Sequence, residues 1–227
     1  MTYKTISLLL IGFFSFTISS SFAFKPESPK LEVAVVNNSM AAKVEAIYEN
    51  LSVNNFMLPQ RKSFKKAMEG YFKLKEKGII QKDILTLVDY SLSSKENRLW
   101  VIDLKNNIIL FQSLVSHGRN SGNEFAGKFS NKPESYKSSL GFYLTGETYY
   151  GKHGYSLRLD GLEKGINDNA RARAIVVHGA DYVSEEFAKQ TGRLGRSLGC
   201  LALSQSLTKE VIDTIKDKSC LFVYYPS

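Results

Sequence analysis

The spacing of apolar residues changes from a helical to a strand-like period after Asn97. A first amphipathic helix is predicted from Ser39 to Leu51, because its apolar residues fall on one face. A second is predicted from Pro59 to Lys77, since proline suits a first helical turn and Gly78 follows as a stop signal. A third, short helix is predicted from Asp83 to Leu92. Apolar stripes at helical spacing are typical of core-facing helices rather than of ligand sites.

Beyond Asn97 the pattern predicts β-strands. Two apolar runs, 98–104 and 108–115, flank Lys105-Asn106-Asn107, which is typical of a β-hairpin. A late helix is predicted from Ser206, as its N-cap, to Lys216. Further strands are predicted at Leu140–Thr145, Tyr155–Leu159, Ala174–His178 and Cys220–Tyr225, with turns at Asp160-Gly161 and Asn167-Asp168-Asn169. The fold class is therefore mainly β with a few helices, preceded by a short helical segment.

The N-terminus has the pattern of an export signal. Lys4 precedes an almost uncharged stretch with an apolar centre at 8–14, and Ser21-Phe22-Ala23 supplies small residues where a signal peptidase reads the chain. An uncleaved membrane anchor is the alternative, but this centre is shorter than the roughly 20 residues that a spanning helix needs. We expect cleavage after Ala23, no stable membrane span thereafter, and a location in the periplasm or cell envelope.

Composition and charge fit one exported domain. We expect a signal peptide at 1–23, a linker at 24–38, a helical segment at 39–95 and a single β-rich domain at 96–227. Of the 227 residues, 43% are hydrophobic, which is enough for an ordinary core. The net charge of +8 comes from dispersed lysines without an aromatic-basic motif. No nucleic-acid partner is expected, and an anionic cell-wall polymer is the simplest partner for a basic exported protein.

Near the C-terminus, residues 177–202 carry the pattern of thiol chemistry. His178 ends an apolar strand, and Cys200 follows in a glycine-flanked turn with Arg193 and Arg196 nearby. A nucleophilic cysteine needs a base and electropositive surroundings, so Cys200 is the candidate nucleophile and His178 the candidate base. Gly199 allows the backbone to turn sharply and to present amide groups to a bound carbonyl.

Together with the segments 140–143, 151–155 and 167–170, these motifs make residues 116–202 resemble the catalytic domain of the murein L,D-transpeptidases. The resemblance implies a mixed β-sandwich or barrel, no cofactor, and peptidoglycan stem peptides as substrates. Cys200 would attack the carbonyl before a D-alanine and form a thioester acyl-enzyme. An amine would then give a cross-link, and water would give carboxypeptidase action. A carbapenem is the expected covalent inhibitor.

The resemblance also implies roles around the nucleophile. The carbonyl of Gly179 would orient His178, and the amides of Gly199 and Cys200 would stabilise an oxyanion. Arg193 or Arg196 would pair with substrate carboxylates. The remaining candidate substrate contacts are Ser197, His153, Tyr155, Arg119 and Asn120.

Three features depart from the better-known members of that family. Leu198 stands where they carry the histidine of Ser-His-Gly-Cys, Ala202 stands where they have Arg or Asn, and the interval between His178 and Cys200 is longer. A divergent branch fits better, in which His153 is a candidate to replace the lost polar group.

Two alternatives stay open. Cys200 and Cys220 are the only cysteines of an exported chain, so they could form a disulfide, which would leave no nucleophile. A catalytically silent peptidoglycan-binding module is the alternative function. The histidines are far apart in sequence and match no zinc spacing, so no metal is expected.

Overall fold

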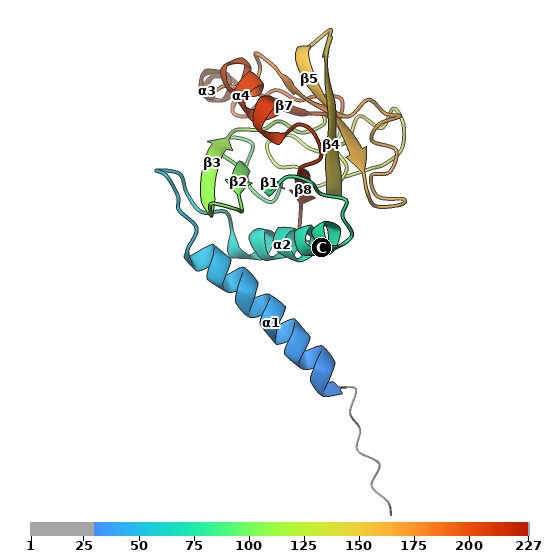
Figure 1. Cartoon of the computed structure of the whole chain (residues 1–227). Coiled ribbons are helices and arrows are strands. Elements are labelled where there is room, and N and C mark those ends of the chain that lie inside the picture. Colours follow the sequence, from blue (N-terminus) through green and yellow to red (C-terminus); the bar gives the residue numbers. More distant parts are fainter. Residues whose placement is uncertain (1–29, 227) are drawn as a thin grey trace, which may run out of the picture.

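The computed structural model describes the backbone of residues 30–226 and the side chains from Met40 onward (Figure 1). The predicted signal peptide, 1–23, lies outside the described residues. The elements in chain order are α1 (Lys30–Glu49), α2 (Arg61–Glu76), β1 (Ile84–Asp89), β2 (Leu99–Asp103), β3 (Ile108–Ser113), β4 (Gly141–Gly151), β5 (Gly154–Gly161), β6 (Val176–Gly179), α3 (Glu185–Thr191), β7 (Leu201–Leu203), α4 (Gln205–Ile215) and β8 (Cys220–Tyr224).

The strands of this part of the chain form one eight-stranded sheet in the order β3-β2-β1-β8-β4-β5-β6-β7. The pairs β1–β8 and β6–β7 are parallel and the others are antiparallel. The predicted hairpin after Asn97 is β2–β3, and the predicted mainly β fold class is confirmed. In Figure 1, α4 and α2 lie on opposite sides of the strands at the centre of this sheet.

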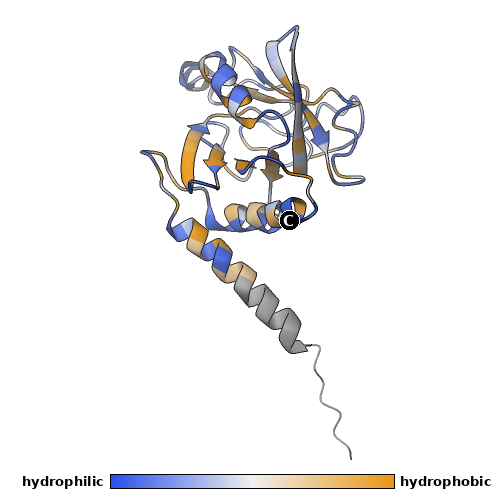
Figure 2. Cartoon of the chain, in the orientation of Figure 1, coloured by the Kyte–Doolittle hydropathy of each residue, from blue (hydrophilic) through white to orange (hydrophobic). Residues whose placement is uncertain are grey.

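Each face of the sheet has its own core, because successive strand residues point to opposite faces. On β8, Leu221 and Val223 join the core beneath α4, whereas Phe222 and Cys220 join the core shared with α1 and α2. In Figure 2, strands β2 and β3 are mostly hydrophobic, whereas α2 mixes hydrophobic and hydrophilic residues, as expected of a helix with one buried face.

Of the two N-terminal helices, α1 begins earlier than predicted, whereas α2 lies where it was expected. α1 begins at Lys30, so residues 30–38 of the predicted linker are helical. No proline or glycine interrupts the chain from Lys30 to Glu49, which explains why the helix extends so far back. α2 occupies the predicted range, and Gly78 follows it with a φ of +68° that favours glycine.

The helix predicted from Asp83 to Leu92 is wrong, because this segment forms β1. β1 lies between β2 and β8, and its residues from Leu85 to Asp89 are all buried. A strand covered on both faces has a continuous apolar run, which periodicity alone does not distinguish from a buried helix. The sheet therefore begins within the segment predicted to be helical, before residue 96.

Smaller differences concern the ends of elements. The predicted turn at Asp160-Gly161 lies at the end of β5. α4 has Ser204 rather than Ser206 as its N-cap. The short elements α3 and β7 were not predicted, since segments of this length carry little periodic signal.

No helix within residues 30–226 has both the length and the apolar character needed to cross a bilayer.

Candidate active site

A pocket of about 380 Å³ opens beside β6, the start of β7 and the turn between β4 and β5. Five of the predicted site residues line it: His178, Cys200, His153, Arg196 and Ser197. Leu198, 51% exposed, also lines the pocket. Within residues 30–226, no group of three His, Cys, Asp or Glu side chains is placed to hold a metal ion.

The parallel pairing of β6 with β7 brings the histidine and the cysteine together. Val177 pairs with Leu201, and both point into the core beneath α4. Because side chains alternate along a strand, His178 and Cys200 point to the other face. Cys200 immediately precedes β7, and His178 lies on the neighbouring strand β6. Both side chains line the same pocket.

The His178 ring is buried and has a defined tautomer. Its Nδ1 lies 2.9 Å from the carbonyl oxygen of Gly179, and a carbonyl only accepts, so Nδ1 carries the proton. Nε2 is then the basic nitrogen. Burial lowers the pKa of His178, with smaller contributions in the same direction from His153 and Lys152, against the bond to Gly179. The imidazole is therefore neutral near pH 7.

The Cys200 thiol is also uncharged at rest. Its Sγ donates to the carbonyl oxygen of Ala174 over 3.5 Å. Burial raises the pKa of the thiol, while a hydrogen bond from the Val176 amide and the charges of Arg173 and Lys152 act in the opposite direction. The site thus pairs a neutral thiol with a neutral base, rather than holding a preformed thiolate.

The turn before Cys200 needs glycine. Gly199 has a φ of +127°, and a Cβ there would lie 2.8 Å from the carbonyl oxygen of Lys137. The Gly199 N–H donates to Ser197 Oγ at 3.0 Å, and that hydroxyl donates to the Cys200 carbonyl at 2.7 Å. Of the two amides predicted to face an oxyanion, Gly199 is thus already bonded within the turn. The Cys200 N–H has no acceptor among the described residues.

His153 covers the candidate base. It lies in the exposed turn between β4 and β5, and its ring stacks on that of His178 with centroids 4.3 Å apart and an interplanar angle of 22°. The stack limits the rotation of His178 and excludes water from one side of its ring.

Arg196 holds a neighbouring loop. Its Nη1 donates to the carbonyls of Arg119 and Gly122 and to Asn123 Oδ1, at 2.8–3.1 Å. Arg119 lies over the ring of Tyr136 at 4.3 Å. This loop forms a second pocket, which Arg196 shares with the first and which also contains Asn120. Arg119 and Asn120 are therefore adjacent to the main pocket, not inside it.

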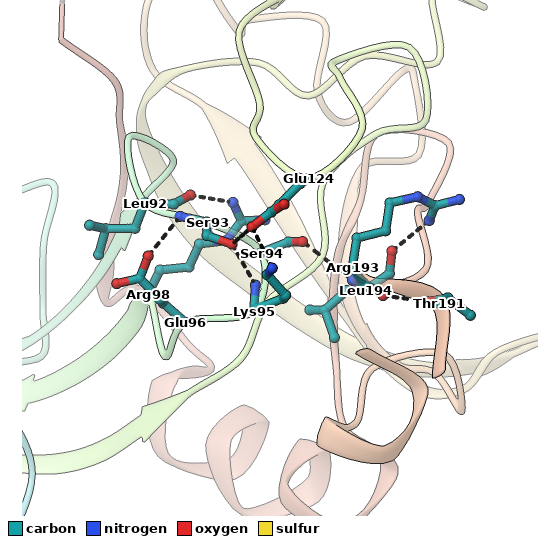
Figure 3. Close-up of polar contacts among 10 residues, drawn as sticks. All are labelled: Leu92, Ser93, Ser94, Lys95, Glu96, Arg98, Glu124, Thr191, Arg193 and Leu194. Atoms are coloured by element: carbon teal, nitrogen blue, oxygen red, sulfur yellow. Dashed lines mark hydrogen bonds and ion pairs between the residues drawn. The ribbon is translucent and has the colours of Figure 1, made fainter. Parts of the chain in front are cut away.

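Two predicted contacts lie elsewhere. Arg193 donates from Nη1 to the Leu194 carbonyl at 2.7 Å, beside the loop that carries Ser94, as Figure 3 shows. Tyr155 donates to Asp213 on α4 at 2.7 Å. The structure brings neither side chain to the lining of the pocket.

Sequence reasoning missed four lining residues with polar side chains: Tyr149, Lys152, Arg173 and Tyr182. Lys152 stands within the 151–155 motif, next to His153, so its position carried a signal. Arg173 follows the predicted turn at 167–169 and precedes the strand of His178. Nothing local distinguishes it from Arg171, because which of the two faces the pocket is a tertiary property.

The profile of one protein family, described as the L,D-transpeptidase catalytic domain, matches residues 58–224. The chain therefore belongs to this family, which confirms the resemblance read from the sequence and the predicted L,D-transpeptidase-like fold. No curated protein sequence shows significant similarity to the chain.

Among solved structures, the chain is similar to an L,D-transpeptidase from Mycobacterium smegmatis at 14% identity, covering 63% of this chain and 59% of that one, with a TM-score of 0.38. It is similar to L,D-transpeptidase 1 of Mycobacterium tuberculosis at 13% identity, covering 62% and 60%, with a TM-score of 0.36. The structure of the LD transpeptidase LdtMt1 in complex with imipenem is also similar, at 13% identity over 63% of this chain and 59% of that one, with a TM-score of 0.39. The aligned part spans about three fifths of each of these chains.

Proposed function

We propose that this protein is an exported cysteine L,D-transpeptidase that acts on peptidoglycan stem peptides. One observation carries the proposal: the Cys200 thiol and the neutral His178 ring, with Nε2 left as its base, line one pocket. The family supplies the substrate class, and the pattern of residues 1–23 supports export.

For activation, the Cys200 thiol must exchange its hydrogen-bond acceptor, from the Ala174 carbonyl to Nε2 of His178. At rest the S–H bond points to the Ala174 carbonyl. When substrate enters, the thiol turns to Nε2 of His178, which takes the proton as sulfur attacks the carbonyl before the D-alanine. The free N–H of Cys200 donates to the oxygen on which negative charge develops. Because Cys200 and His178 are both neutral at rest, the thiolate and the imidazolium form only during this step.

The tetrahedral intermediate then collapses. The C–N bond to D-alanine breaks, His178 returns the proton to the leaving amine, and the acyl group remains on Cys200 as a thioester. An amine from a second stem peptide, deprotonated by His178, attacks the thioester carbonyl; the C–S bond breaks, His178 returns the proton to the Cys200 sulfur, and a 3→3 cross-link results. Water in place of the amine gives the carboxypeptidase product. Both acceptors belong to this proposal.

A silent peptidoglycan-binding module is the second candidate. The observation that favours it is the resting state of Cys200, whose burial raises the pKa of its thiol, next to Leu198 in place of the family's histidine. In that case the cationic side chains around the pocket bind the anionic polymer without turnover.

Intact mass spectrometry of residues 24–227 with imipenem tests the proposal. We expect one covalent adduct on the native protein and none on Cys200→Ser, because only the thiol is a competent nucleophile. His178→Ala should slow adduct formation on the order of 10² to 10⁴-fold, since it removes the general base. No adduct on a folded native protein, or an unchanged adduct on Cys200→Ser, would favour the binding module or another nucleophile.

A further inference from the structure

Arg173 is held rigidly at the side of the pocket. Its Nη1 donates to the Ser130 carbonyl at 2.8 Å and to Ser139 Oγ at 2.6 Å. Its Nη2 donates to the Lys137 carbonyl at 2.7 Å and to Ser135 Oγ at 3.3 Å. Four of the five N–H bonds of the guanidinium are thus directed to the 130–139 segment, which leaves only the Nε–H uncommitted. The group is fixed in place and is not free to form a bidentate clamp on a ligand.

All four acceptors are neutral, so the charge of Arg173 is not compensated. No Asp or Glu within the described residues forms an ion pair with it. Arg171, on the same turn, is the opposite case, because it pairs with both Glu147 and Asp160. A partly buried guanidinium bonded only to neutral groups acts strongly on any negative charge that forms nearby.

The turn that presents Cys200, whose sulfur forms such a charge, lies next to Arg173. A Cβ built on Gly199 would lie 3.4 Å from Nη2 of Arg173, so the guanidinium contacts the turn that presents Cys200. Both side chains line the same pocket. The charge of Arg173 lowers the pKa of the Cys200 thiol, in opposition to burial.

We propose that Arg173 is a positioning residue of this active site, whose fixed and uncompensated positive charge stabilises the Cys200 thiolate as it forms. The inference rests on the proposed role of Cys200 as nucleophile. In this proposal Arg173, which is neither the nucleophile nor the base, counters the unfavourable effect of burial on the charged form of the thiol.

Six other titratable groups line the pocket with Cys200 and Arg173: Tyr149, Lys152, His153, His178, Tyr182 and Arg196. Lys152 and His153 are exposed, so water screens their charge. Arg196 is committed to the loop at 119–123. Arg173 is the cation that combines partial burial, fixed orientation and contact with the turn before Cys200.

The test is the pH dependence of Cys200 alkylation by iodoacetamide, a reaction in which the thiolate displaces iodide without any peptidoglycan substrate. In Arg173→Gln we expect the midpoint of the rate profile to rise by about 1 to 3 pH units, the effect of losing a nearby opposite charge. At pH 7 the rate should fall about tenfold or more. Cys200→Ser gives the background from the buried Cys220.

Three matched variants separate charge from structure. Arg171→Gln removes an already paired guanidinium from the same turn and should leave the profile unchanged. Ser139→Ala removes one hydrogen-bond partner of Arg173 but no charge and should also leave the midpoint in place. Arg173→Lys keeps the charge and should retain most of the native profile.

A profile of folded Arg173→Gln that superimposes on the native one would overturn the proposal, as would an equal shift in Arg173→Lys and Arg173→Gln. Circular dichroism establishes the folded state, and Arg173→Met repeats the test with an apolar side chain if Gln does not fold. The outcome is separate from that of the imipenem experiment. A missing adduct with a shifted alkylation profile contradicts the proposed function alone, and an adduct with an unshifted profile contradicts the role of Arg173 alone.

Discussion

At the scale of single residues, the candidate site contains two groups, His178 and Cys200, that burial keeps uncharged. Burial lowers the pKa of His178 and raises the pKa of Cys200, because it disfavours the charged form of each. The two shifts have the same consequence, a neutral pair over the physiological range. The stacked ring of His153 contributes to this environment on the histidine side.

Removing the stacked ring should therefore change the titration of His178. The folded-state pKa of His178 lies below its ordinary value of 6.5, so the ring becomes charged only as the pH falls through that lower value. His153→Ala should hydrate the ring and move the transition to higher pH, toward 6.5, as followed by an NMR titration of the His178 ring protons. His153→Phe keeps an aromatic cover and should retain the low value. Coincident titrations for His153→Ala and the native protein would show that the stack has no such effect.

At the scale of elements, two short strands and one helix matter most. β6 and β7 set the pairing that places His178 and Cys200 on one face. α2 lies on the far face of the sheet, where Phe64 and Met68 are buried against the strands that the helix covers. This helix covers the core on that face of the sheet. It therefore affects the site only indirectly, by stabilising the sheet that carries the site residues.

A cavity in that second core should destabilise the fold. Met68 is fully buried, and Met68→Ala should cost about 2 to 5 kcal/mol of unfolding free energy through lost transfer energy and an unfilled cavity. Chemical denaturation monitored by circular dichroism measures the difference. Lys66→Ala, on the exposed side of the same helix, is the control and should change stability by less than about 0.5 kcal/mol. Equal effects of the two substitutions would contradict the assigned packing.

At the scale of the whole molecule, the structure extends beyond the part that the family shares. The family match begins at residue 58, after α1. Yet Val44, Tyr48 and Leu51 are buried in the same core as α2, and Tyr48 packs edge-on against Phe64 with ring centroids 5.2 Å apart. α1 is thus packed on the shared domain through its C-terminal half.

Deletion of this helix should leave a folded but weaker domain. Each of the three buried side chains contributes at most about 1.5 to 3 kcal/mol, so residues 58–227 should lose several kcal/mol relative to residues 24–227. With about 2 to 4 °C per kcal/mol for a domain of this size, a fall in Tm of roughly 10 °C is expected. Calorimetry compares the two. An unchanged Tm would mean that α1 contributes nothing to the stability of the sheet.

The arrangement of the whole sheet decides whether the two cysteines can form a disulfide. Sequence left a Cys200–Cys220 disulfide open, and both cysteines are free in the structure. Cys220 begins β8 and Cys200 precedes β7, with β4, β5 and β6 between them. Cys220 is buried in the core shared with α1 and α2, whereas Cys200 lines the pocket, so their side chains lie in different parts of the molecule.

The sequence by itself determined the mainly β class, the hairpin after Asn97, the range of α2 and the thiol–histidine motif, because each is encoded in local period, turn residues or spacing. The tertiary structure decided that residues 84–89 are a central strand, since burial on both faces erases the alternation that marks a strand. It also decided that Arg173 faces the pocket whereas Tyr155 and Arg193 do not, and that burial leaves both His178 and Cys200 neutral. Packing partners and the degree of burial are set by residues far apart in the chain, and no local pattern records them.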